Sequence, residues 1–210
     1  MTAGPIRFEE SEIALLSDPA LFRKKARIDT GLRRTLEQVR AELQVEVQAC
    51  PLLVPEGFEP TRFQLVKGEH LEDHPYQYLD YPKHFQGQTK FTFRTLIWWG
   101  HHVVFAWILE GGELAVYKRH LLARYQDLAG EQLEIGLAPS LWEWKRGEGY
   151  TLPLLPDRRS HVAAVIERRP TLKIGRAVPL GDREIREGRL PQLARRAFRG
   201  MRPIVAVDSA

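Results

Sequence analysis

Residues 90–110 read KFTFRTLIWWGHHVVFAWILE. Two runs rich in β-branched and aromatic side chains, residues 90–99 and 102–110, flank a Gly100-His101 pair, and this pattern is typical of a β-hairpin. Glycine at the first loop position favours a type II′ turn. Apolar side chains occupy both alternating positions of the second run, as in a strand that is covered on both faces. The stretch therefore predicts the centre of an antiparallel sheet.

Helical patterns lie before and after this hairpin. Between Leu32 and Val47, apolar side chains recur every three or four residues, which predicts an amphipathic helix that ends before Pro51. A second apolar stripe runs through residues 113–127, and Asp182 is placed to cap a last helix. We therefore predict an α+β fold with a largely antiparallel sheet around residues 90–110, flanked by helices from the N-terminal, middle and C-terminal segments.

The predicted organisation is a single domain over residues 1–210. It comprises a helical N-terminal segment (1–50), a sheet-containing core (61–180) and a C-terminal helix (182–200). Three parts of the core carry their own predictions: a polar loop at 67–74, an extended segment or edge strand at 75–85, and a short strand at 141–144. The edge position is expected for 75–85 because its two prolines cannot donate to a central ladder.

Composition restricts where the protein acts. Cys50 is the one cysteine in 210 residues, which excludes an internal disulfide and favours a reducing, cytoplasmic location. Residues 1–12 carry three glutamates where an export signal needs basic and then apolar residues. The longest apolar run, residues 103–109, is far shorter than the roughly 20 residues of a membrane-spanning helix. We therefore expect a soluble cytoplasmic protein with no membrane partner.

Basic charge is concentrated in the last quarter of the chain. Residues 157–210 hold 13 Lys and Arg against 6 Asp and Glu, although the whole chain has a net charge of only +4. A basic flank can bind nucleic-acid phosphates, so a nucleic-acid-binding protein is one alternative function. The arginines are spread along the segment as pairs, which is more typical of solvated helix faces. Nucleic-acid binding is therefore not the favoured prediction.

Several landmarks between residues 90 and 200 resemble a known family in their order and spacing. They are Trp98-Trp99-Gly100, Phe105-Ala106-Trp107, Leu141-Trp142-Glu143-Trp144, Leu172-Lys173-Ile174-Gly175, Val178-Pro179-Leu180, and Leu193 followed by Ala197-Phe198. This arrangement resembles the YktB-like family, bacterial proteins of unknown function. The resemblance implies a bacterial protein with an antiparallel sheet flanked by helices, and it supplies no catalytic residues.

Polar and aromatic side chains suited to ligand binding gather between residues 76 and 102. If the segment 76–85 lies beside the hairpin, Tyr78 and Tyr81 would form the walls of a pocket, and Asp80 and Arg94 would be the polar groups that orient the ligand. The predicted binding residues are Tyr78, Asp80, Tyr81, His84, Arg94, Trp98 and His101. We therefore favour a binding module for a small ligand or a protein partner.

An enzyme is the other alternative. A hydrolase or transferase would use Asp80, His84 and either His101 or His102 as acid–base groups, and it requires at least three of them to converge. Asp80 also has a purely structural interpretation, as the partner that a buried Arg94 needs.

No metal or cofactor is predicted. The histidines of His70-Leu71-Glu72-Asp73-His74 are spaced as in a zinc-protease motif, but the glutamate stands one place too late. The glycine-rich loops that bind nucleotide phosphates are absent from the sequence.

Overall fold

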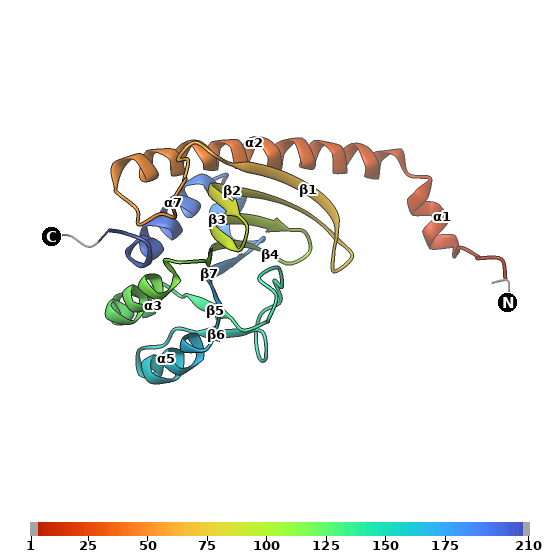
Figure 1. Ribbon diagram of the computed structural model, residues 1–210. Coiled ribbons are helices and arrows are strands. Elements are labelled where there is room, and N and C mark those ends of the chain that lie inside the picture. The colour runs from red at the N-terminus through yellow and green to blue at the C-terminus, as the bar shows by residue number, and fades with distance from the viewer. Residues whose placement is uncertain (1–3, 208–210) are drawn as a thin grey trace.

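The computed structural model describes residues 4–207 (Figure 1). Its helices are α1 (Glu10–Leu16), α2 (Pro19–Ala49), α3 (Leu114–Ala123), α4 (Tyr125–Ala129), α5 (Arg159–Glu167), α6 (Arg183–Arg186) and α7 (Leu190–Met201). Its strands are β1 (Gln64–Leu71), β2 (His74–Gln86), β3 (Thr89–Trp98), β4 (His102–Glu110), β5 (Glu134–Gly136), β6 (Thr151–Pro153) and β7 (Thr171–Pro179). Two short 3-10 helices, η1 (Pro156–Arg158) and η2 (Arg202–Ile204), complete the order.

The strands form one sheet in the order β1-β2-β3-β4-β7-β5-β6, and each neighbouring pair is antiparallel. The predicted hairpin is β3 and β4, in the middle of this sheet. The predicted α+β fold with an antiparallel sheet is therefore confirmed. The type II′ turn is wrong, because the turn runs from Trp98, whose carbonyl accepts from the His101 N–H, and Gly100 is its third residue with φ of 72°.

The helices other than α1 pack on one side of the sheet, which we call the helix-covered face. Alternate residues of β3 point to this face and join a single hydrophobic cluster with α2, α3, α5 and α7. Members from these elements include Leu36, Leu43, Phe91, Phe93, Trp107, Leu121, Ile166 and Phe198. Burial of each such side chain contributes about 1.5–3 kcal/mol, so this layer supplies most of the driving force for folding.

An ion-pair cluster joins α2 to α7. The carboxylate of Glu46 is almost completely buried and accepts hydrogen bonds from Arg195 Nε at 2.7 Å and Arg199 Nε at 2.8 Å. Arg202 Nη1 lies 3.8 Å from the same carboxylate. These contacts neutralise a charge that would otherwise be costly to bury, and they use arginines of the basic C-terminal quarter.

Two parts of the predicted core differ in the structure. The proposed polar loop 67–74 is largely strand: β1 extends to Leu71, and only Glu72 and Asp73, both with positive φ, form the turn into β2. The segment 75–85 lies inside the sheet between β1 and β3, so its predicted edge position is wrong. Pro75 stands near the start of β2, and Pro82 falls where the β2–β3 ladder is interrupted, so neither proline is required to donate within it.

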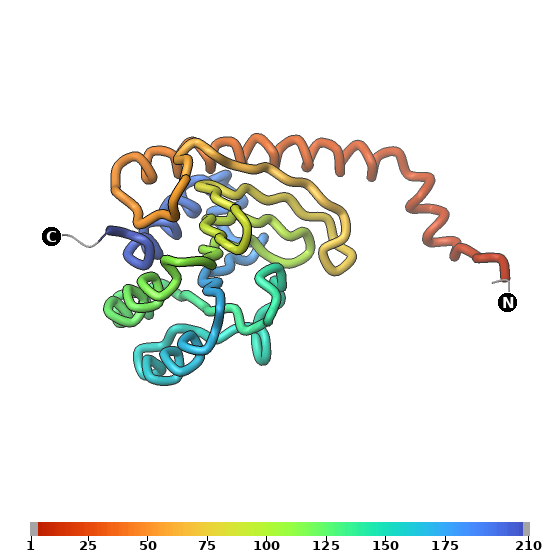
Figure 2. The backbone as a smooth tube through the Cα atoms, in the orientation of Figure 1, coloured from red at the N-terminus to blue at the C-terminus, as the bar shows by residue number. Residues whose placement is uncertain are grey.

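Residues 141–144 are not a strand. They belong to the segment 137–150, which we call the covering loop and which leaves the sheet after β5 and returns at β6 (Figure 2). None of the helices within residues 4–207 is long and apolar enough to cross a membrane.

Removing the charge of Glu46 should destabilise the protein in a pH-dependent way. The Arg199 and Arg195 hydrogen bonds hold the pKa of Glu46 below its ordinary value of 4.5. We expect Glu46→Gln to lower the free energy of unfolding by about 2 kcal/mol at neutral pH, because two charge-assisted hydrogen bonds are weakened. The difference should shrink as the pH falls from 4.5 through the lowered pKa, because Glu46 is then protonated in both states.

Urea denaturation of both proteins at several pH values measures this effect. Glu42→Gln is the control, because Glu42 forms an ion pair with Arg195 while its side chain is 32% exposed. A loss for Glu46→Gln no larger than that for Glu42→Gln would contradict the role assigned to the buried carboxylate.

Candidate functional site

The sheet face opposite the helices, here the groove face, carries a different kind of surface. Residues paired across antiparallel strands share a face, so the pairs Tyr78–Leu96 and Asp80–Arg94 place four side chains on this side. A smaller hydrophobic cluster lies there, formed by Leu96, Trp98, Val104, Ala106, Ile108 and Trp144. No helix packs on this cluster in the described part of the chain, and the covering loop lies over it instead.

A bulge in β2 decides which side chains reach the groove face. Asp80 pairs with Arg94 and Lys83 pairs with Thr92, so three steps along β2 match two along β3. The extra residue reverses the alternation between Asp80 and Lys83. His84 pairs with Phe91 and so shares its helix-covered face.

A buried ion pair stands at the centre of the groove face. Arg94 donates from Nε and Nη2 to the two carboxylate oxygens of Asp80, each at 2.7 Å. Asp80 is fully buried and the Arg94 side chain is 5% exposed. These two bonds to Asp80 leave the third guanidinium nitrogen, Nη1, outside the ion pair. The pair is therefore electrically balanced but retains donor capacity.

Aromatic rings surround this guanidinium. Its central carbon lies 3.7 Å from the Tyr78 ring centroid, 4.8 Å from that of Trp142 and 5.6 Å from that of Trp144. These distances are within the range of cation–π contacts, which stabilise a desolvated guanidinium.

Beside these rings lies a cavity of about 270 Å³, which we call the aromatic groove. It is lined by Leu71, Tyr76, Tyr78, Phe85, Arg94, Leu96, Trp142 and Trp144. The Tyr76 and Tyr78 rings are parallel at 6.2 Å, and the ring of Tyr76 lies directly over Gly68, where any Cβ would collide with it. The groove is thus built from flat apolar walls with a cation at one place.

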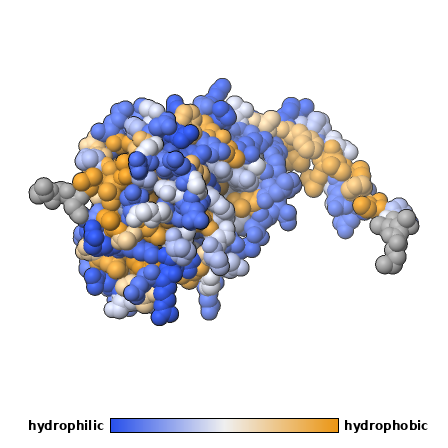
Figure 3. All heavy atoms as spheres, in the orientation of Figure 1, coloured by the Kyte–Doolittle hydropathy of each residue, from blue (hydrophilic) through white to orange (hydrophobic). Residues whose placement is uncertain are grey.

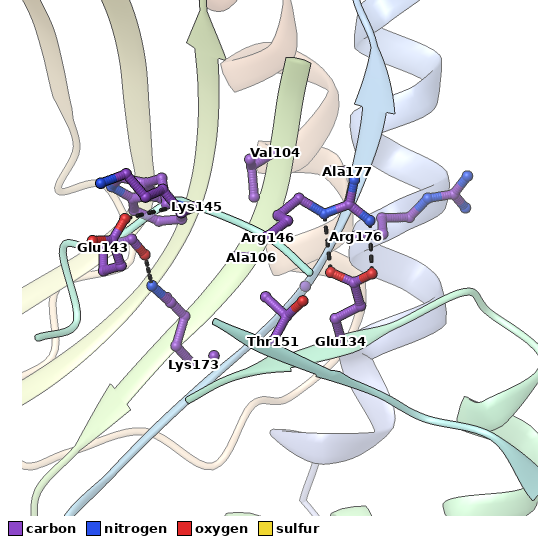
Figure 4. A pocket seen from close by; sticks show the side chains of 13 residues that line it. Val104, Ala106, Glu134, Glu143, Lys145, Arg146, Thr151, Lys173, Arg176 and Ala177 are labelled. Carbon is purple, nitrogen blue, oxygen red and sulfur yellow. Dashed lines mark hydrogen bonds and ion pairs between the residues drawn. The ribbon is translucent and has the colours of Figure 1, made fainter. Parts of the chain in front are cut away.

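Polar contacts of three side chains, Lys173, Arg146 and Lys145, fasten the covering loop to the sheet. Lys173 Nζ donates to the carbonyl of Glu143 (Figure 4) and, at 3.2 Å, to the carbonyl of Leu141. Arg146 forms a bidentate pair with Glu134 at 2.7 and 2.9 Å, as Figure 4 shows. Lys145 pairs with Glu72 in the β1–β2 turn at 3.0 Å. These contacts position Trp142 and Trp144 over the sheet.

A second, smaller cavity adjoins the loop on the other side of Trp144. Its volume of about 40 Å³ leaves room for water only, so we do not regard it as the ligand site. His102 packs against the Trp98 ring, and burial lowers its pKa to about 4, so the imidazole is neutral at physiological pH.

The structure brings together only part of the predicted site. Tyr78 and Arg94 line the aromatic groove, and the Asp80 carboxylate accepts a hydrogen bond from the Arg94 guanidinium. Trp98 lies on the same face, nearer the hairpin turn, where its Nε1 donates to the Leu71 carbonyl and His101 stacks on its ring at 3.7 Å.

Two predicted residues lie elsewhere. Tyr81 belongs to the cluster on the helix-covered face, and His84 is buried on that face beside Phe91. The acid–base set of Asp80, His84 and a hairpin histidine therefore does not converge.

Sequence reasoning missed several walls of the groove. Phe85 reaches it only because of the bulge, and Pro82 was the available signal, since proline inside a strand marks an interrupted ladder. Trp142 and Trp144 reach it because their segment is a loop that folds back over the sheet. Local sequence carries no signal for such a long-range contact.

Within residues 4–207, no group of three His, Cys, Asp or Glu side chains is arranged to hold a metal ion. Comparisons of the chain with protein-family models, curated proteins and solved structures gave no match. The resemblance to the YktB-like family therefore stays a prediction, and the functional conclusion depends on the site itself.

Asp80 and Arg94 should each destabilise the protein when the other is removed. We expect Arg94→Met to lower the free energy of unfolding by about 3–5 kcal/mol, because it leaves the Asp80 carboxylate buried without a partner. Asp80→Leu combined with Arg94→Met should recover most of this loss. Urea denaturation of the three proteins measures both effects, and a double variant as unstable as the single one would contradict this explanation.

Lys173 should make stability rise with pH in the alkaline range. Burial, together with the charges of Arg94 and Arg169, lowers its pKa from 10.5 to about 8, against the opposing effect of Glu143. Between these two values the unfolded state binds more protons than the folded state, so the free energy of unfolding increases with pH. We expect the difference between the wild-type protein and Lys173→Met to grow in the wild type's favour over this interval. Parallel pH profiles in denaturation experiments would refute this expectation.

Proposed function

We propose that the protein is a binding module for a small, planar, mostly apolar organic ligand that carries one hydrogen-bond acceptor. The observation that supports this is the aromatic groove, where Tyr78, Phe85, Trp142 and Trp144 line one cavity around the Arg94 guanidinium. Ligand pockets commonly have this composition, with apolar and aromatic walls and few polar groups.

The walls favour a flat ligand. Aromatic rings gain about 0.5–1.5 kcal/mol from stacked or edge-to-face contacts beyond the burial of their area. Trp142 is 42% exposed although it belongs to the wall, so a ligand would remove apolar surface from water on binding. The volume of about 270 Å³ limits the ligand to one or two fused rings.

The cation favours a neutral acceptor on that ligand. Asp80 already balances the charge of Arg94, so the groove offers N–H donors without a large net positive charge. A carbonyl or amide oxygen suits this environment better than a phosphate group does. The two negative charges of a phosphate would need cations that no carboxylate already neutralises.

Binding is favoured over the two alternatives considered. The acid–base groups of the enzyme hypothesis lie on opposite faces of the sheet. Much of the basic charge of the C-terminal quarter is paired with carboxylates: Arg195 and Arg199 with Glu46, Arg196 with Glu184, and Arg183 with Glu187. Phosphate binding would have to compete with these pairs. A cytoplasmic location belongs to the same proposal, because the lone Cys50 fits a reducing compartment.

Binding of 2-naphthamide, a flat probe with one amide, tests the proposal. The five tryptophan indole N–H signals of the labelled protein report where it binds in proton–nitrogen NMR spectra. We expect saturable shifts for Trp142 and Trp144 with a Kd of about 1 mM or tighter, and none for the fully buried Trp107. Cyclohexanecarboxamide, which has the same amide and no flat ring, should bind more weakly.

Variants identify the groove as the binding site. Trp142→Ala should weaken 2-naphthamide about fivefold by removing a stacking wall. Phe63→Ala is the matched control, because Phe63 is 41% exposed and does not line the groove, and it should leave the affinity unchanged. The stable Asp80→Leu/Arg94→Met protein should lose the contribution of the amide. Equal affinity in wild-type protein and Trp142→Ala would refute the proposal.

A further inference from the structure

The N-terminal arm, residues 4–28, extends away from the rest of the molecule (Figure 1), to which Lys25 links it through an ion pair with Glu69 at 2.9 Å. It consists of the segment leading into α1, α1 itself and the first turns of α2. None of its described residues is buried. In Figure 3 the arm projects from the body and exposes apolar residues along its length. It contributes almost nothing to the hydrophobic clusters of the sheet.

The arm exposes large apolar side chains at high density. They are Ile6, Phe8, Ile13, Leu15, Leu16, Leu21, Phe22 and Ile28. Single exposed apolar residues are ordinary on a protein surface, but a run of this kind on one projecting element marks an interaction surface.

The apolar stripe of the arm continues the buried face of α2. Leu21 and Ile28 are seven residues apart, and Leu32 and Leu36 follow at intervals of four. These spacings keep all four on one side of the helix. Leu36 is buried against the sheet, whereas Leu21 and Ile28 lie beyond the point where this packing ends and are exposed. The helix therefore carries a packing surface longer than the sheet that it covers.

Charge divides the arm and the adjoining turns of α2 into two halves. Residues 4–18 contain four acidic side chains and one basic side chain. Residues 19–34 contain six basic side chains and one acidic side chain. The boundary falls at the junction between α1 and α2.

We propose that two copies of this chain pair through their N-terminal arms, antiparallel and about a two-fold axis near the α1–α2 junction. In this arrangement the acidic α1 of each copy lies along the basic start of α2 of the other, and the apolar stripes face each other. A two-fold contact repeats each interaction, so both charge halves are matched twice. The chain itself supplies both complementary surfaces, so the partner that covers the arm is a second copy of the chain.

A membrane surface fits the arm less well. Helices that lie on anionic membranes combine an apolar face with basic residues on the same segment. In the arm, α1 exposes apolar side chains and is acidic at its start, through Glu10, Glu12 and the N-cap residue Glu9. An anionic lipid surface would repel it.

Sedimentation equilibrium of the full chain tests the proposal, because it gives mass independently of the extended shape. At about 50 µM protein and about 50 mM NaCl we expect a mass of twice 24.2 kDa. Leu16→Glu should raise the dimer dissociation constant about a hundredfold or more, because it places a charge in the apolar contact. Its circular dichroism and thermal midpoint, measured below the dissociation constant, should match those of the wild-type monomer.

Two further variants separate this contact from other modes of association. Val45→Glu is the matched control: Val45 is an exposed apolar residue on α2 outside the arm, and this variant should remain dimeric. Arg23→Glu/Lys24→Glu should weaken the dimer at least tenfold at low salt, and much less at about 500 mM NaCl, because it opposes acidic residues with acidic residues.

Three results would overturn the proposal. The first is a monomer under these conditions, and the second is a dimer that Leu16→Glu leaves intact. The third is a monomer that cosediments with phosphatidylserine vesicles, which would assign the arm to a membrane surface.

Discussion

The register between β2 and β3 is the constraint on which the site depends. Pairing Asp80 with Arg94 puts the two charges side by side in a place from which water is almost excluded. The pair satisfies both charges, and its cost of burial is offset by two short hydrogen bonds and the surrounding aromatic rings. A shift of one residue would move every side chain of β2 to the opposite face and leave each charge without its partner.

The two faces of the sheet differ in how they are covered. One is packed by helices into a continuous hydrophobic cluster and supplies the stability of the fold. The other is covered only in part, by a loop that polar contacts such as Lys173 to the carbonyl of Leu141 hold in place. An open groove lies there between the loop tryptophans and the sheet. The stable face thus allows the other face to keep an open, preorganised cavity.

The same asymmetry appears along α2. From Leu36 onward the helix is part of the core, and the buried Glu46 ties it to α7. Before Ile28 its apolar stripe has no partner within the described chain. Helix propensity and amphipathic pattern are continuous across this boundary, so the pattern predicts a packing surface and does not say whether that surface lies inside the molecule or between molecules.

The sequence by itself determined the α+β class and the central hairpin, because these follow from periodicity over a few neighbouring residues. It also predicted correctly that Tyr78, Asp80 and Arg94 lie together, since Tyr78 and Asp80 precede the bulge of β2 and Arg94 pairs with Asp80. Only the tertiary structure decided that His84 turns to the helix-covered face, that Phe85 takes its place, and that Trp142 folds over the sheet. Those outcomes depend on one extra residue in β2 and on the contact between the covering loop and the sheet, and local periodicity predicts neither.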